Sequence, residues 1–228
     1  MSRTNDPARA EVLAAIRRSL GVTGAEAPRR AAVEERLANA PRGVIPARGQ
    51  ADGEERLAVF AREVEISLAT IARVESAEAV PAAIAEFLRE HNLPAAIRMG
   101  EDERLAAMPW DETALAIERG PSAGGDLVGV SHAFGGVAET GTLALVSGPQ
   151  NPSTLNFLPD THVVVVRASD VARDYESLWA RLRETYGRGL MPRTVNWVTG
   201  PSRSGDIEQR LFLGAHGPRR LHVVLVEG

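Results

Sequence analysis

The sequence contains no cysteine and no lysine, and each absence excludes a class of chemistry. All 26 of its basic residues are arginine. Without cysteine the chain cannot supply a disulfide, a thiol nucleophile, a cysteine zinc site or thiolate ligands for an iron–sulfur cluster. Without lysine it cannot form a lysine Schiff base or use a P-loop lysine, which excludes pyridoxal enzymes and ordinary Walker ATPases.

The chain is also poor in aromatic residues and in net charge. Aromatic residues make up 4% of its 228 residues, and the formal net charge is −4, which gives no electrostatic reason to bind nucleic acid. No stretch approaches 18 consecutive apolar residues, and residues 1–10 are polar and lack the core of a signal peptide. We therefore expect a cytoplasmic protein that binds neither nucleic acid nor a membrane. With 44% hydrophobic residues, it can bury a core without disulfides or a structural metal.

Residues 1–21 have the pattern of an amphipathic helix. Asp6 can cap this helix, Pro7 suits its first position and Gly21 can end it. Its apolar stripe consists of Val12, Leu13, Ile16 and Leu20. The stripe predicts docking, either onto the same chain or onto a neighbouring one. Residues 22–53, rich in Ala, Arg, Pro and Gly, are expected to form a linker, and residues 54–228 the main domain.

In the main domain, helical and extended patterns alternate. Helices are expected near residues 57–68, 80–88, 171–186 and 203–213. Strands are expected near residues 70–74, 95–99, 113–117, 126–130, 142–147, 163–166, 194–199 and 222–226. Strands that are apolar on both faces belong inside a sheet that is covered on both sides. The pattern therefore predicts an α/β fold, a three-layer α/β/α sandwich with a largely parallel sheet, in which ligands collect beyond the carboxyl ends of the strands.

A first candidate for chemistry is the segment 131–142, which lies between two expected strands. Glycine and alanine surround Glu139, and Thr140 and Thr142 add hydroxyl groups, so the backbone could approach a ligand closely. The glycine spacing fits neither a Rossmann fingerprint nor a P-loop. The segment is either a binding loop or a tight strand connection in which Glu139 only accepts backbone hydrogen bonds.

A second candidate is the segment 199–208, which the pattern predicts to run from a strand into a helix. Free N–H groups at such a helix start, with Ser202 or Ser204 as the cap, would bind an anion, and Arg203 would add a bidentate fork. Asp206 and Glu208 could instead satisfy the same helix dipole. The segment is therefore either an anion site or a helix start that needs no ligand.

A third candidate is His216, which a turn at residues 217–218 places at the tip of a loop. Its imidazole could act as a general acid or base, or could cap backbone carbonyl groups. A serine-hydrolase triad of Ser202, Asp206 and His216 is too compact to be favoured, since the second glycine of G-x-S-x-G is replaced by Ser204. The histidines lack metal-site spacing, so no metal is expected.

Four segments together resemble the LUD-domain family, also called LutC/YkgG or lactate utilization protein C. The segments are residues 138–142, 158–162, 200–208 and 214–223, and the resemblance extends over about residues 55–228. It implies a fold similar to the NagB/RpiA/CoA-transferase group and a role in oxidising L-lactate to pyruvate. It also implies iron–sulfur partner proteins. The clusters would lie in those partners, so no cofactor is expected in this chain.

These inferences combine into one hypothesis, a non-redox subunit that binds a small carboxylate or other anion between two walls. One wall would consist of Glu139, Thr140, Gly141 and Thr142, and the other of Gly200, Pro201, Ser202, Arg203 and Asp206, with His216 nearby. Arg203 would contact the carboxylate, and Glu139 and His216 are the candidate catalytic residues. The alternatives are a free-standing acyl-CoA transferase or sugar-phosphate enzyme that uses Glu139, and a module that docks partners through the helix at residues 6–20. A homo-oligomer is possible.

Overall fold

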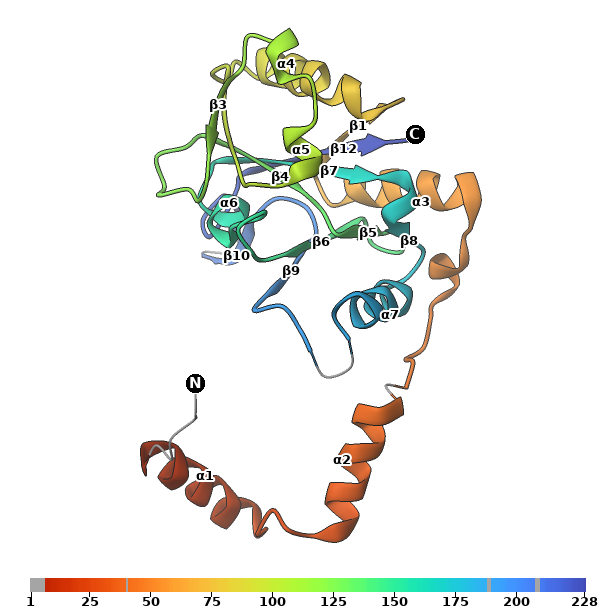
Figure 1. Ribbon diagram of the computed structural model, residues 1–228, viewed down its shortest axis with the longest axis vertical. Coiled ribbons are helices and arrows are strands. Elements are labelled where there is room, and N and C mark those ends of the chain that lie inside the picture. The colour runs from red at the N-terminus through yellow and green to blue at the C-terminus, as the bar shows by residue number, and fades with distance from the viewer. Residues whose placement is uncertain (1–6, 40, 188–189, 208–209) are drawn as a thin grey trace. The chain divides into compact units, whose positions relative to one another are not determined.

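The computed structural model describes residues 7–39, 41–187, 190–207 and 210–228 (Figure 1). The chain divides into two compact units, Met1–Gly43 and Val44–Gly228. Asp6 and Glu208, which the sequence suggested as helix-capping or dipole-satisfying acids, lie outside the described residues. No helix among the described residues is long and apolar enough to cross a membrane.

The described residues of the first unit form two helices, α1 (Pro7–Leu20) and α2 (Ala27–Asn39). Helix α1 confirms the sequence prediction, and Gly21 follows it with a φ of 64°, a conformation that favours glycine at a helix end. Helix α2 corrects the expectation of a linker without regular structure. Its proline, Pro28, lies in the first turn, where the missing N–H group interrupts no helical hydrogen bond.

A six-stranded sheet forms the centre of the second unit, and every strand pair in it is parallel. Its order is β1 (Thr70–Val74), β12 (Arg220–Val226), β7 (Thr161–Arg167), β4 (Val128–His132), β2 (Ala96–Met99) and β3 (Ala116–Arg119). Helices α3 (Gly53–Ile66) and α4 (Val80–Glu90) cover it, together with the short helices α5 (Glu103–Ala106) and α6 (Ser153–Phe157). The predicted α/β sandwich with a parallel sheet is confirmed.

Strand β7 shows how the core is divided between the two faces of the sheet. Val163 and Val165 pack with the apolar side chains of α4, whereas Val164 and Val166 pack with those of α3. All four side chains are fully buried. A continuous β-branched run therefore forms a central strand that is covered on both sides.

A second sheet, which the sequence did not predict, lies in one covering layer. Its order is β8 (Val171–Ala172), β5 (Gly135–Val137), β6 (Thr142–Val146) and β9 (Val195–Val198). Helix α7 (Tyr175–Tyr186) packs on it through Leu178. The sequence predicts residues 194–199 as one more strand in the parallel succession, but β9 pairs antiparallel with β6.

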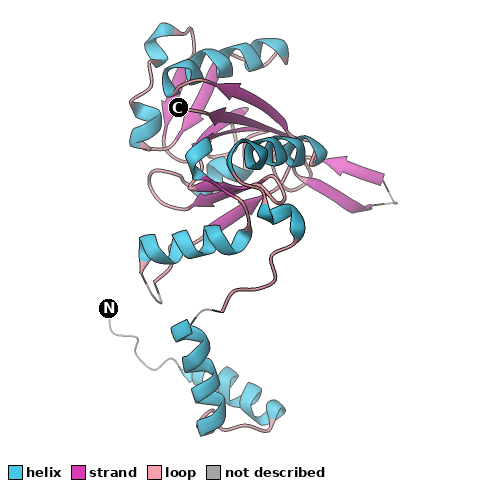
Figure 2. Ribbon diagram, turned by 90° about the vertical axis from the view of Figure 1, so that its right-hand side faces the viewer, coloured by secondary structure: helices cyan, strands magenta, loops and turns pink. Residues whose placement is uncertain are grey.

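The sequence predicts a helix at residues 203–213, but the described residues of this segment form a β-ribbon. Strands β10 (Arg203–Ile207) and β11 (Arg210–Leu213) pair antiparallel, and Figure 2 shows the ribbon extending from the domain. Its base is closed by a hydrogen bond from Gly214 N to Ser202 O of 2.9 Å. Ser204 and Gly205 have low helix propensity, which weakens a helix at its first turn. The predicted anion site at a helix start is therefore wrong.

Candidate functional site

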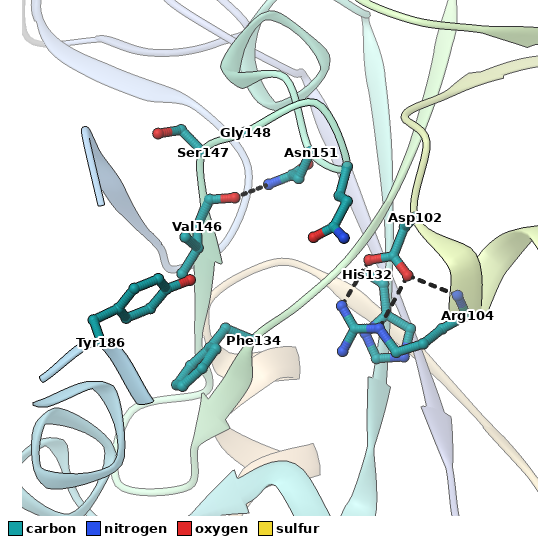
Figure 3. A pocket seen from close by; sticks show the side chains of 10 residues that line it. Asp102, Arg104, His132, Phe134, Val146, Ser147, Gly148, Asn151 and Tyr186 are labelled. Carbon is teal, nitrogen blue, oxygen red and sulfur yellow. Dashed lines mark hydrogen bonds and ion pairs between the residues drawn. The ribbon is translucent and has the colours of Figure 1, made fainter. Parts of the chain in front are cut away.

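The carboxyl ends of β2 and β4 meet at a topological switch point. The two strands are neighbours, but the chain continues from β2 to β3 on one side of the sheet and from β4 to β7 on the other. The connections diverge there, and ligands of open α/β sheets bind at such points. A cavity of about 140 Å³ lies at this place (Figure 3). Its lining residues are Asp102, Arg104, His132, Phe134, Val146, Ser147, Gly148, Gln150, Asn151 and Tyr186.

One side of this switch-point cavity holds an arginine whose orientation is set by an aspartate. Asp102 caps α5 by accepting a hydrogen bond from Arg104 N at 2.9 Å. The same carboxylate accepts hydrogen bonds from Arg104 Nε at 3.0 Å and Nη2 at 2.7 Å. Burial alone would raise the pKa of Asp102, but the hydrogen bonds and charge of Arg104 outweigh it and lower that pKa. A guanidinium has five N–H donors, so Arg104 retains three for a ligand.

His132, the last residue of β4, lies beside this pair (Figure 3). Burial, and after it the charge of Arg104, lowers the pKa of His132 to about 4, so the ring is neutral at pH 7. Nδ1 lies 2.9 Å from Ala133 O, and because a carbonyl oxygen only accepts, Nδ1 carries the hydrogen. Nε2 bonds to no residue that the structure describes, and its lone pair can accept a hydrogen bond.

The rest of the cavity lining is mixed: Phe134, Val146 and Tyr186 provide apolar and aromatic surface, and Ser147, Gln150 and Asn151 are polar. The rings of Phe134 and Tyr186 lie 6.4 Å apart between centroids. Arg181 contacts Phe134 in two ways. Its Cζ lies 5.1 Å from the centroid of the Phe134 ring, and its Nη2 donates a hydrogen bond to Phe134 O at 3.0 Å. An oriented cation, a neutral histidine and an apolar wall together suit a small carboxylate that carries a hydroxyl group.

The sequence-predicted residues near position 200 lie together, but at the other edge of the sheet. Gly200, Pro201, Ser202, Arg203 and His216 all line a second cavity of about 280 Å³. This amino-edge cavity also touches the second residue of β7 and of β12, so it lies at the amino ends of the parallel strands. Asp206 belongs to β10, and its side chain is not among those described.

Residues 139–142, here called the acidic turn, do not form a second wall of the amino-edge cavity. Glu139 is 8% exposed and lies under the turn Ala47–Gln50, with Oε2 3.2 Å from the position that a Cβ on Gly49 would occupy. None of the residues 139–142 belongs to the described lining of the amino-edge cavity. The expected hollow between two walls is therefore wrong, and the burial of Glu139 does not favour it as a nucleophile.

The remaining residues of the turn pack against the fold. Thr142 Oγ1 lies 2.6 Å from Thr199 Oγ1 and 2.8 Å from the Tyr175 hydroxyl, and the latter is 3.1 Å from Thr140 Oγ1. Gly141 has a φ of 64° and lies against the backbone of α3. These contacts join the second sheet to its neighbours, which is a structural role.

Comparisons with known proteins point to one family. The model of the LUD domain matches residues 57–226. The chain is 35% identical over 100 residues to "Lactate utilization protein C" from Geobacillus sp. (strain WCH70), a match covering 43% of this chain and 42% of that protein. The corresponding protein of Bacillus subtilis (strain 168) is 32% identical over 100 residues, with the same coverage. These alignments thus span less than half of the curated relatives.

A solved structure shows the same fold. The crystal structure of a DUF162 family protein from Deinococcus radiodurans is similar with a TM-score of 0.56 and 25% sequence identity. The similarity covers 77% of this chain and 99% of that chain. It therefore extends over most of the α/β fold described above.

Proposed function

The chain belongs to the LUD domain family, and we propose that it acts in lactate utilization by binding L-lactate in the switch-point cavity. The names of the curated relatives support the role in lactate utilization. L-Lactate is the proposed ligand because Arg104 and a neutral His132 lie in the same small cavity.

In this proposal the arginine binds the carboxylate and the histidine selects the hydroxyl group. The free N–H groups of Arg104 donate to the carboxylate of lactate. Nε2 of His132, as an acceptor, takes the hydrogen bond of the lactate hydroxyl, and the apolar wall at Phe134 contacts the methyl group. Asp102 holds the guanidinium in place through two hydrogen bonds.

The proposal includes partners that carry the electrons. The family resemblance implies oxidation of L-lactate to pyruvate together with iron–sulfur proteins. This chain has no cysteine, and its described residues hold no group of three or more histidine, aspartate or glutamate side chains that could bind a metal ion. Its donor set therefore does not fit an iron–sulfur cluster, which supports placing the clusters in partner proteins.

Titration calorimetry with L-lactate tests the proposal through Arg104→Gln. We expect this variant to bind L-lactate at least tenfold more weakly, because a lost charge-assisted hydrogen bond costs about 1.5–3 kcal/mol. Arg203→Gln is the matched control, since Arg203 lines the other cavity. Equal affinity in Arg104→Gln and the unsubstituted protein, or an equal loss in Arg203→Gln, would contradict the site.

Pyruvate and propanoate provide a second comparison at pH 7. Neither has a hydroxyl hydrogen to donate to Nε2 of His132, and a site built around that acceptor discriminates against such analogues. We expect both to bind several-fold more weakly than L-lactate in the same titration. Tighter binding of pyruvate at pH 7 would show that His132 donates to the ligand instead.

A further inference from the structure

Gln150 lines the switch-point cavity with a side chain that the fold itself does not use. Two other polar residues of the same lining bond to the backbone. Ser147 Oγ accepts a hydrogen bond from Thr194 N at 3.0 Å, and Asn151 Nδ2 donates one to Val146 O at 3.3 Å (Figure 3). The carboxamide of Gln150 makes no hydrogen bond with any residue that the structure describes. It is therefore available to a ligand.

The backbone of Gln150 is held at the tip of a tight turn between β6 and α6. Gly148 N donates to Asn151 O at 3.2 Å, and Asn151 N donates to Gly148 O at 3.1 Å. These two hydrogen bonds close the turn and leave Pro149 and Gln150 at its tip. Proline restricts the φ of the first of these residues. The position from which the Gln150 side chain starts is therefore well defined.

The same turn is docked on the segment that carries the arginine of the site. Glu101 N donates a hydrogen bond to Pro149 O at 3.2 Å. Gly100 lies so close to the carbonyl group of Gln150 that a Cβ on Gly100 would be 2.1 Å from Gln150 O. Arg104 follows directly, in the short helix α5. The positions of Gln150 and Arg104 are therefore fixed relative to each other through one short stretch of backbone.

The carboxylate of L-lactate has room for a further donor after Arg104 has bound it. Its two oxygens offer about four lone-pair sites, and a bidentate guanidinium occupies about two of them. The amide group of Gln150 has two N–H donors and no net charge. It can therefore donate to the carboxylate without repelling it, whereas an acidic side chain at this position would repel it.

We propose that Gln150 is a specificity-determining residue of the lactate site, in which its Nε2 donates a hydrogen bond to the substrate carboxylate beside Arg104. This assignment rests on the proposed function, because it places both side chains on the same ligand. It makes position 150 a determinant of the head group that the site takes. A neutral donor there admits a carboxylate, and a charged acceptor at the same place would favour the neutral amide of the same acid.

Titration calorimetry with L-lactate and L-lactamide tests this assignment through Gln150→Glu, which keeps the shape of the side chain but replaces its donor with a charged acceptor. We expect L-lactate to bind this variant at least tenfold more weakly than the natural chain. L-Lactamide, whose NH₂ group can donate to the introduced carboxylate, should bind the variant several-fold more tightly than it binds the natural chain. Gln150→Leu should weaken L-lactate several-fold and bring no gain for L-lactamide. Gln150 is exposed, so both variants are expected to fold.

Gln50→Glu is the matched control, because it makes the same change of charge at an exposed residue outside the cavity lining. An unchanged affinity of Gln150→Glu for L-lactate, or an equal loss in Gln50→Glu, would overturn the assignment. A parallel loss of L-lactate and L-lactamide binding in Gln150→Glu would also overturn it, since that result indicates a changed cavity shape. In these cases a tenfold loss in Arg104→Gln would still support the lactate site, whereas no binding of L-lactate by the natural chain would overturn both.

Discussion

We expect the protein to lose about 5 kcal/mol of its free energy of unfolding between pH 7 and pH 5, because three histidines are buried as neutral rings. Burial lowers the pKa of His132 to about 4 and that of His162 to about 3. Burial, and after it the charge of His91, lowers the pKa of His222 to about 4. Each unit of such a shift corresponds to about 1.4 kcal/mol.

The direction of this pH effect follows from the protons bound in each state. The ordinary pKa of histidine is 6.5, so below that pH the unfolded chain binds protons that the folded chain excludes. Stability therefore falls as the pH drops from about 6.5 toward 4 for His132 and His222, and toward 3 for His162. Well above pH 7 these three side chains are neutral in both states and contribute no slope.

Urea unfolding at pH 7, 6 and 5 measures this loss, and His222→Gln is the matched variant. His222 stacks on Phe87 at 3.9 Å between centroids, and its Nδ1 lies 2.8 Å from Thr70 Oγ1. Glutamine can keep a hydrogen bond to Thr70 but cannot titrate. We expect the variant to be less stable at pH 7 and to lose about a third less between pH 7 and pH 5. Equal stability of the natural chain at pH 7 and pH 5 would contradict the argument.

Gly141→Ala is expected to lower the free energy of unfolding by about 2–5 kcal/mol. The left-handed conformation, with a φ of 64°, costs about 1–2 kcal/mol for a residue with a Cβ. That Cβ would also lie 2.5 Å from Val64 N and 2.6 Å from Glu63 C, and such overpacking against backbone costs about 1–3 kcal/mol more.

Gly125→Ala is the control for this substitution, because a Cβ there would meet no atom within 4 Å. Urea unfolding of the two variants measures the difference. If Gly141 served a ligand instead of the fold, Gly141→Ala would keep its stability and lose only L-lactate affinity. That result would restore a binding role to the acidic turn.

Local pattern predicted the strands of the central sheet well. The expected strand at residues 70–74 is confirmed as β1, and the run at 163–166 lies within β7. These segments are short, rich in β-branched residues and bounded by turns, so their own sequence determines their structure. The predicted helices around residues 80–88 and 171–186 likewise follow a clear apolar period.

The candidate site could not be predicted in the same way. Asp102 and Arg104 lie at a helix of four residues, too short to give a period, and His132 ends a strand far from them in sequence. Only the strand order brings them together, and that order depends on long-range pairing. A partial signal was available, since Asp102 two residues before Arg104 is the pattern of a helix cap.

The errors near the C-terminus have a related cause. Strands β10 and β11 form a ribbon whose base is held by the hydrogen bonds of Ser202, Gly214 and Pro218. The apolar residues there suggested a helical face, but the segment has no partner in the parallel sheet. Sequence reasoning therefore grouped the correct lining residues of the amino-edge cavity while assigning them the wrong local structure.

The chain connections after β2 and β4 run to opposite sides of the sheet, and this arrangement determines which segments a ligand in the switch-point cavity contacts. The switch-point cavity takes its walls from the parallel sheet, from the loop after β6 and from the end of α7. A bound molecule thus spans segments that must all be assembled at once. Saturating occupancy should raise the melting temperature of the whole domain in one cooperative transition, rather than rigidify a single loop.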